Sequence, residues 1–240
     1  MPTDPQRPHG SDTRMNAVVI GGIVCILLAV IHMQTSGFAA AVDPAGLPKV
    51  DFLAFWAAGR AANEGALADV YNSAKLLEME HRIIPVDNFY MPFLNPPPFL
   101  ALAQILASVT FVTSLQLWMA VCAGVYLAAA WRLFPNRYAF LAAAFFPPFL
   151  WSLLIGQMTG LTAVMTVAAL LNLEKRPALA GMLIGLLIFK PQGAVLIPVA
   201  LAASRNWKAF GFAAGTVALL VLLSLGLYGP SLWLDFSGQL

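Results

Sequence analysis

Asp51 is the carboxylate whose surroundings best suit acid-base chemistry. It opens the stretch "DFLAFWAAGRAANEGALADVYN", which follows a long apolar segment. On a helix that turns about 100° per residue, Asp51 points about 180° away from Arg60, toward the side of Phe55 and Ala62. It therefore lies off the solvated face, where a carboxylate could take a proton from a hydroxyl during group transfer. The alternative is that Asp51 only caps a helix that begins at Phe52.

Three polar residues in the second half of the chain could bind a substrate. Lys190 is the one cation in the second half of the chain that we expect at the extracytoplasmic end of a membrane helix, where its ammonium suits a lipid phosphate. Gln157, in "GQMTG", could donate a hydrogen bond to a polar ligand, and Gln192 follows Lys190 in "KPQG". Two alternatives stay open: Lys190 could snorkel to the membrane interface, and Gln157 could simply close a tight turn. Arg60 could contact a phosphate, although pairing with Glu64 would also explain it.

The composition argues against several other classes of function. The net charge of +2 is not gathered into a basic stripe, so we expect no binding to nucleic acid. Cys25 and Cys122 each lie within an apolar run, where a thiol packs like a small apolar side chain, so we expect neither disulfide nor redox chemistry. Glu78 and Glu80 resemble half of a metal site, but we expect no metal and no cofactor.

The distribution of apolar residues predicts an all-α, polytopic membrane protein. The chain is 60% hydrophobic and 10% charged, with a mean hydropathy of +0.79, and several runs approach the ~20 residues that cross a bilayer. Residues 1–15 are polar and predict a disordered cytoplasmic tail, and the run after them predicts an uncleaved anchor rather than a signal peptide. The apolar segments are 16–34, 97–113, 115–133, 138–155, 157–173, 178–189, 191–204 and 209–228.

Short basic loops predict the orientation of these segments in the membrane. The pairs Arg132/Arg137, Lys175/Arg176 and Arg205/Lys208 should lie in the cytoplasm. The parity of crossings then requires that 97–113, which begins with "NPPPF", is re-entrant or lies in the interface. Seven crossings remain, and residues 35–114 form an extracytoplasmic loop with interfacial helices. In that loop we expect the aromatic residues near Asp51, namely Phe52, Phe55 and Trp56, to enter the lipid headgroup region.

The stretch that begins at Asp51 is followed, in order, by "NPPPFLALAQIL", "FFPPFLWSLLIGQMTGL" and "LIGLLIFKPQGAVLIPVALAASRNWKAF". This order of motifs resembles glycosyltransferase family 87, within the GT-C superfamily of polyprenyl-phosphate-sugar-dependent transferases. The resemblance runs from about Asn16 to the end of the chain. It departs from the family pattern at Asn95, where a tyrosine is frequent. Family members are usually longer, so we expect an N-terminal fragment whose C-terminal part is missing.

This resemblance implies an inverting hexosyltransferase of the bacterial inner membrane. Its donor would be a polyprenyl-phosphate sugar, with mannose the expected hexose, and its acceptor a hydroxyl of a glycolipid or glycan on the periplasmic side. In the family the aspartate after the first helix is the catalytic base, which corresponds to Asp51 here. Lys190 becomes a candidate for the donor phosphate. Two other classes stay open: a transporter or lipid flippase, and a noncatalytic membrane scaffold.

Overall fold

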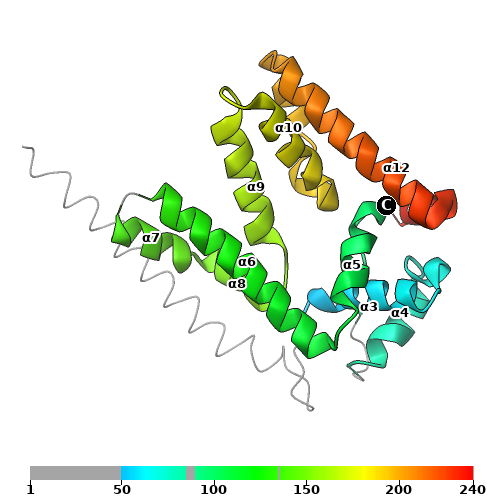
Figure 1. The fold of residues 1–240 in the computed structure, drawn as a ribbon. Coiled ribbons are helices and arrows are strands. Elements are labelled where there is room, and N and C mark those ends of the chain that lie inside the picture. The colour runs from blue at the N-terminus through cyan, green and yellow to red at the C-terminus, as the bar shows by residue number, and fades with distance from the viewer. Residues whose placement is uncertain (1–49, 85–89, 135, 240) are drawn as a thin grey trace, which may run out of the picture.

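The computed structural model describes residues 50–84, 90–134 and 136–239, and all regular secondary structure within these ranges is helical (Figure 1). The expected tail at 1–15 and the expected anchor at 16–34 lie outside the described residues. The α-helices are α3 (Phe52–Asn63), α4 (Ser73–His81), α5 (Leu100–Leu106), α6 (Phe111–Leu133), α7 (Arg137–Ala144), α8 (Pro147–Leu154), α9 (Thr159–Asn172), α10 (Pro177–Leu186), α11 (Ile197–Ala203) and α12 (Trp207–Gly238). Four short 3₁₀ helices connect them: η2 (Leu67–Asp69), η3 (Pro97–Phe99), η4 (Leu187–Phe189) and η5 (Pro191–Gly193).

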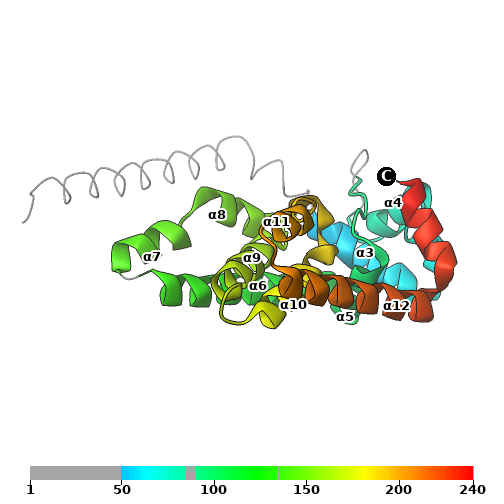
Figure 2. The same cartoon turned by 90° about the horizontal axis from the view of Figure 1, so that it is seen from above.

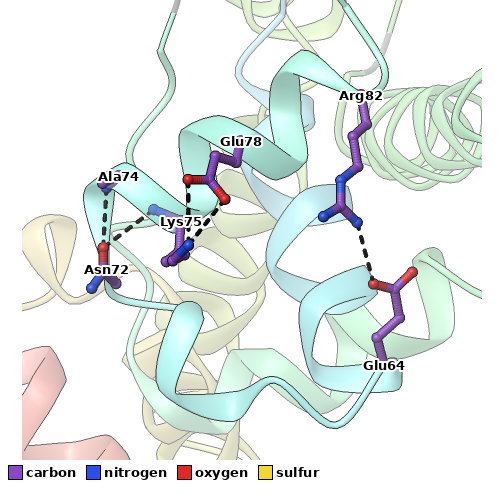
Figure 3. Close-up of polar contacts among 6 residues, drawn as sticks. All are labelled: Glu64, Asn72, Ala74, Lys75, Glu78 and Arg82. Atoms are coloured by element: carbon purple, nitrogen blue, oxygen red, sulfur yellow. Dashed lines mark hydrogen bonds and ion pairs between the residues drawn. The ribbon is translucent and has the colours of Figure 1, made fainter.

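Proline and short polar side chains determine where many of these helices begin. Pro147 and Pro177 occupy the first turns of α8 and α10, where a missing backbone N–H costs nothing. Asn72 caps α4, because its Oδ1 accepts hydrogen bonds from two backbone N–H groups of the first turn. Figure 3 shows this cap. Asn136 and Thr110 cap α7 and α6 in the same way.

Two helices of the described residues, α6 and α12, are long and apolar enough to cross a membrane. Helices α7 and α8 are separated by a break at which the chain bends by 40°. If this pair counts as one span, the described residues contain three candidate spans. The expected crossings at 157–173, 178–189 and 191–204 form shorter helices, and the 14 residues of α9 reach only ~21 Å of the ~30 Å hydrocarbon thickness. The expected number of seven crossings is therefore not confirmed.

The segment 97–113 does not form one continuous helix. It contains a short apolar helix, made of η3 and α5, and then a turn that leads into α6 at Phe111. The ten residues of this short helix are too few for a full span, as are those of the short apolar helices later in the chain, so the helix length does not single out 97–113 as the segment that fails to cross. Gln104 holds α5 against its neighbours, because its backbone oxygen accepts from Asn63 and its side-chain oxygen accepts from Tyr228 of α12.

Helix α3 lies inside the protein rather than against lipid headgroups. Its solvated side is as expected, since Arg60, Asn63 and Glu64 are exposed. The expectation for its aromatic face was wrong: the side chains of Phe52, Phe55 and Trp56 are 0%, 4% and 8% exposed. Helix α5 and the first turns of α6 cover this face, with Phe99, Phe111 and Trp118 packed edge-on or tilted against it. The removal of each ring from water stabilises the fold by on the order of 2 kcal/mol. The aromatic face of α3 belongs to the larger of the two clusters of buried apolar side chains among the described residues.

The C-terminal part of α12 contacts the region around Tyr71, near the start of the described residues. α12 is bent at Gly229 and Pro230, where Gly229 has a φ of 78°. Figure 2 shows the part after this bend turned toward α4. There Phe236 packs against Tyr71 with 5.5 Å between the ring centroids, and Gln239 donates to the backbone oxygen of Tyr71. The predicted span 209–228 thus ends where the helix leaves its straight course.

Helices α10 and α12 pack with their backbones very close together. α10 carries Gly181 and Gly185 four residues apart on one face. A Cβ atom at Gly181 would lie 2.3 Å from the backbone oxygen of Ala209, and one at Gly185 would lie 2.5 Å from Cβ of Thr216. Small residues at this spacing allow such an approach between apolar helices. The contact fixes the position of η4, which follows α10 and leads to Lys190.

We expect Gly181→Ala to destabilise the protein by about 2 kcal/mol, because the added methyl group overlaps a backbone oxygen that cannot move alone. The matched control is Gly215→Ala on α12, where a Cβ atom meets nothing within 4 Å. Both changes favour the helical backbone to the same degree, so the difference between them measures the contact. Thermal unfolding in detergent tests this, and equal melting temperatures for the two variants would contradict it.

Candidate functional site

Three polar side chains that lie far apart in the sequence meet in the structure. Nε2 of Gln157 donates a hydrogen bond of 2.6 Å to Oδ2 of Asp51. Nζ of Lys190 donates one of 3.0 Å to Oε1 of the same glutamine. The orientation of the amide is fixed by its partners, because a carboxylate requires an N–H and an ammonium requires an oxygen. One glutamine thus bridges a carboxylate and an ammonium, and all three residues were predicted as site residues.

These side chains line a cavity of about 260 Å³. Gln192, a further predicted site residue, lies on its wall. The cavity combines a few convergent polar groups with an apolar lining, which is typical of a small-molecule site. Its polar residues are Asp51, Asn95, Gln157, Lys190 and Gln192, and its apolar residues are Ala54, Phe55, Met91, Pro92 and Leu94.

The position of Asp51 comes from the junction between α3 and the end of α8. The backbone N–H of Phe52 donates to the backbone oxygen of Ile155 at 3.3 Å. The side chain of Asp51 makes no capping hydrogen bond to α3, so the capping role considered from the sequence is not seen. Its Oδ2 accepts from Gln157 instead, and among the described residues no donor reaches Oδ1. The second oxygen therefore remains able to accept a proton or a hydrogen bond.

A tight turn at the end of α8 presents Gln157 to Asp51. The backbone N–H of Gln157 donates to Ser152 O at 2.8 Å and that of Gly156 to Leu153 O at 3.0 Å, the pattern of a Schellman motif. Gly156 has a φ of 69°, and a Cβ atom there would lie 2.5 Å from Cβ of Phe52. Only glycine fits both requirements. Gln157 therefore closes a turn with its backbone and binds Asp51 with its side chain.

Lys190 lies between η4 and η5, and Asn95 holds the backbone beside it. Nδ2 of Asn95 donates to the backbone oxygen of Phe189 at 2.7 Å. The backbone oxygen of Asn95 in turn accepts from the hydroxyl of Tyr71 at 2.7 Å. Burial lowers the pKa of Lys190, and the negative charge of Asp51 opposes that shift. Asn95 thus joins Tyr71 to the backbone beside the lysine, a role that sequence analysis missed because its partner is a backbone group 94 residues away.

Arg60 is the predicted site residue that the structure does not bring to the cavity. Its Nε lies 2.8 Å from Oε1 of Glu64 on the exposed side of α3, so the surface pairing considered from the sequence is observed. Arg82 lies 3.8 Å from the other oxygen of Glu64, as Figure 3 shows. Lys75 and Glu78 form a similar exposed pair on α4. Such pairs contribute little to stability because water screens them.

Glu80 differs from Glu78 because it is completely buried. Its Oε2 accepts a hydrogen bond of 3.0 Å from the backbone N–H of Met91, which lines the cavity together with Pro92, Leu94 and Asn95. Burial raises the pKa of Glu80 to about 7, and the hydrogen bond from Met91 opposes the shift. Glu80 therefore acts on the wall of the cavity through a single hydrogen bond to the backbone of Met91. Within the described ranges, no three side chains of metal-binding type gather into a group around it or elsewhere.

Glu80 should make the stability of the protein depend on pH. With a pKa near 7 in the folded state and 4.5 in solvent, the folded protein retains a proton that the unfolded chain releases. This contribution is complete below about pH 4.5 and is lost as the pH rises toward about 7. We expect a loss of at most about 3 kcal/mol between about pH 5 and pH 8.

Glu80→Gln should remove this part of the pH dependence, because glutamine keeps an acceptor for Met91 without a titrating group. Glu78→Gln, on the exposed face of the same helix, is the matched control and should retain it. Unfolding measured in detergent across this pH range checks the expectation. A Glu80→Gln protein with the wild-type pH dependence would contradict it.

The comparisons with known proteins place the chain in a family. Residues 93–240, more than half of the chain, match the model of glycosyltransferase family 87. The matched region contains Asn95, Gln157, Lys190 and Gln192, whereas Asp51 precedes it. No curated protein and no solved structure matches the chain. Together with the apolar helices α6 and α12, the family match shows a membrane glycosyltransferase: the chain belongs to glycosyltransferase family 87.

Proposed function

We propose that this membrane glycosyltransferase moves a hexose, with mannose as the expected sugar, from a polyprenyl-phosphate donor to an acceptor hydroxyl on the extracytoplasmic side. The observation that carries the proposal is the bridge from Asp51 through Gln157 to Lys190 within one cavity. It sets a proton acceptor and a cation in the same small space. In transfer from a lipid phosphate to a hydroxyl, the first can take the proton of the hydroxyl and the second can stabilise the departing phosphate. Family membership favours this function over the transporter and the scaffold.

Asp51 is the general base in this proposal. The acceptor hydroxyl attacks the anomeric carbon, and its proton passes to the free oxygen of Asp51 as the new carbon–oxygen bond forms. Gln157 holds the other oxygen of the carboxylate at 2.6 Å, which fixes the direction of the free one. Positioning of this kind removes part of the entropic cost of bringing the reacting groups together. A single displacement inverts the anomeric centre, so a β-linked donor yields an α-linked product.

Lys190 stabilises the leaving group. When the bond between the anomeric carbon and the phosphate oxygen breaks, the electron pair stays with the phosphate, whose added negative charge an ammonium can stabilise. Gln157 uses one of the three donors of the ammonium, which leaves two for phosphate oxygens. A phosphate leaves readily without protonation, so no general acid is required. Asn95 keeps Lys190 in place through Phe189, and Gln192 lies on the same wall.

The course of the helices supports an extracytoplasmic location for this cavity. α9 leads away from Gln157 to the basic loop with Lys175 and Arg176, and α10 with η4 returns from that loop to Lys190 (Figure 1). The cavity and the basic loop thus lie at opposite ends of the same two helices. Basic residues in short loops are typical of the cytoplasmic side. This arrangement favours a cavity on the outer side.

We expect Asp51→Asn to lower turnover about 10²- to 10⁴-fold, because asparagine cannot accept the proton of the acceptor. The full-length protein in membranes is supplied with polyprenyl-phosphate-mannose and candidate acceptors, and the initial rate of sugar transfer is measured. Glu78→Gln, the same type of change on the exposed face of α4, serves as the control and should leave the rate unchanged. Equal turnover of Asp51→Asn and wild type would remove Asp51 from the mechanism.

We expect Lys190→Gln to lower kcat about 10²-fold or more, because the charge on the departing phosphate loses its cation. Binding of the donor should weaken as well, since the ammonium also contacts the phosphate before reaction. Lys208→Gln, an exposed lysine in the first turn of α12, is the matched control. The dependence of the initial rate on donor concentration separates the two effects. An unchanged kcat would exclude a role for Lys190 in the departure of the phosphate.

A further inference from the structure

A second cavity lies between the C-terminal half of α6 and the stretch of α9 from Ala163 to Asn172. It has a volume of about 540 Å³ and shares no residue with the cavity that contains Asp51. Alanines on both helices, including Ala129, Ala130, Ala163 and Ala168, leave the space between them open. Among the described residues that line it, the polar side chains besides Tyr126 are those of Arg132 and Asn172, at the ends of α6 and α9. We call this cavity the α6–α9 groove.

The groove joins an apolar floor to a basic rim. Arg132 is exposed and, within the described part of the chain, makes no ion pair. The adjoining loops carry three more exposed basic side chains, Arg137, Lys175 and Arg176, against one exposed acidic side chain, Glu174. Such loops are typical of the cytoplasmic leaflet, whose surface is negative because it contains anionic lipids. The rim and the floor therefore suit two parts of one amphipathic ligand.

We propose that the α6–α9 groove binds an anionic phospholipid, with an acyl chain along the alanine floor and its phosphate on Arg132. The charge of the rim decides between this ligand and an apolar segment of the chain itself. The apolar segment 16–34 contains no acidic residue, and the stretch 1–15 before it has as many basic as acidic residues, so the two together bring no net negative charge to Arg132. A lipid headgroup supplies that negative charge, while its chain replaces the water that an apolar groove would otherwise expose. The proposal does not depend on the sugar-transfer reaction.

The experiment measures binding of lipids to the purified protein in detergent. Phosphatidylglycerol is the anionic probe, and phosphatidylcholine with the same acyl chains is the neutral one. The thermal shift at increasing lipid concentration gives an apparent dissociation constant, and native mass spectrometry counts the lipids that remain bound. We expect phosphatidylglycerol to bind at least about fivefold more tightly than phosphatidylcholine, the equivalent of about 1 kcal/mol for one arginine near the headgroup.

Two variants separate the rim from the floor of the groove. Arg132→Gln should remove the preference for phosphatidylglycerol, whereas Lys208→Gln, an exposed cation outside the groove, should retain it. Ala163→Phe should weaken the binding of both lipids, because the ring fills the groove from an exposed position on α9. Since both groove positions are exposed, these changes should leave the melting temperature without lipid close to that of the wild type.

Three outcomes would overturn the proposal. The first is equal affinity of the wild type for the two lipids. The second is an Arg132→Gln or Ala163→Phe variant that binds phosphatidylglycerol as the wild type does. The third is a disulfide between Cys25 and a cysteine introduced by Ala163→Cys, since it would show that the segment 16–34 of the chain itself occupies the groove.

Discussion

The hydrogen bonds of one glutamine amide organise the cavity of this protein. Gln157 donates to Asp51 and accepts from Lys190, so it satisfies a carboxylate and an ammonium that do not contact each other directly. A charged group removed from water is costly unless it is paired or hydrogen-bonded. The bridge meets that requirement for both groups while keeping a space between them. That space is where an acceptor hydroxyl and a lipid phosphate would meet in the reaction we propose.

The core of the protein holds this bridge in place. Phe52 follows Asp51 directly and lies against Gly156, which directly precedes Gln157. The indole N–H of Trp118 donates to the backbone oxygen of Gly156 at 2.9 Å, so α6 also holds the turn. The aromatic face of α3 therefore positions the two polar residues that flank its contact with the end of α8. Burial of this face in protein rather than in lipid gives the site a rigid support, since close-packed interiors resist small displacements.

The site could be predicted only in part from the sequence. Asp51, Gln157, Lys190 and Gln192 could be named because polar residues are rare and conspicuous among apolar runs, and the family resemblance gave roles to Asp51 and Lys190. Arg60 was named because arginine often binds phosphate, yet it pairs with Glu64 at the surface. Asn95 and Glu80 were not recognised, because each acts on a backbone group and such contacts have no pattern in the sequence. Helix α3 was placed in the interface because its periodicity shows an apolar face but does not identify what covers it.

The sequence by itself determined that this is a helical membrane protein of glycosyltransferase family 87, because apolar runs and ordered motifs are local properties of the chain. Only the tertiary structure decided which polar residues share a cavity, since residues 51, 157 and 190 are brought together by packing between α3, α8 and η4. It also decided that α3 is buried in protein. The physical reason is that an apolar side chain loses contact with water equally well against lipid or protein, and only the arrangement of the helices determines which of the two it meets.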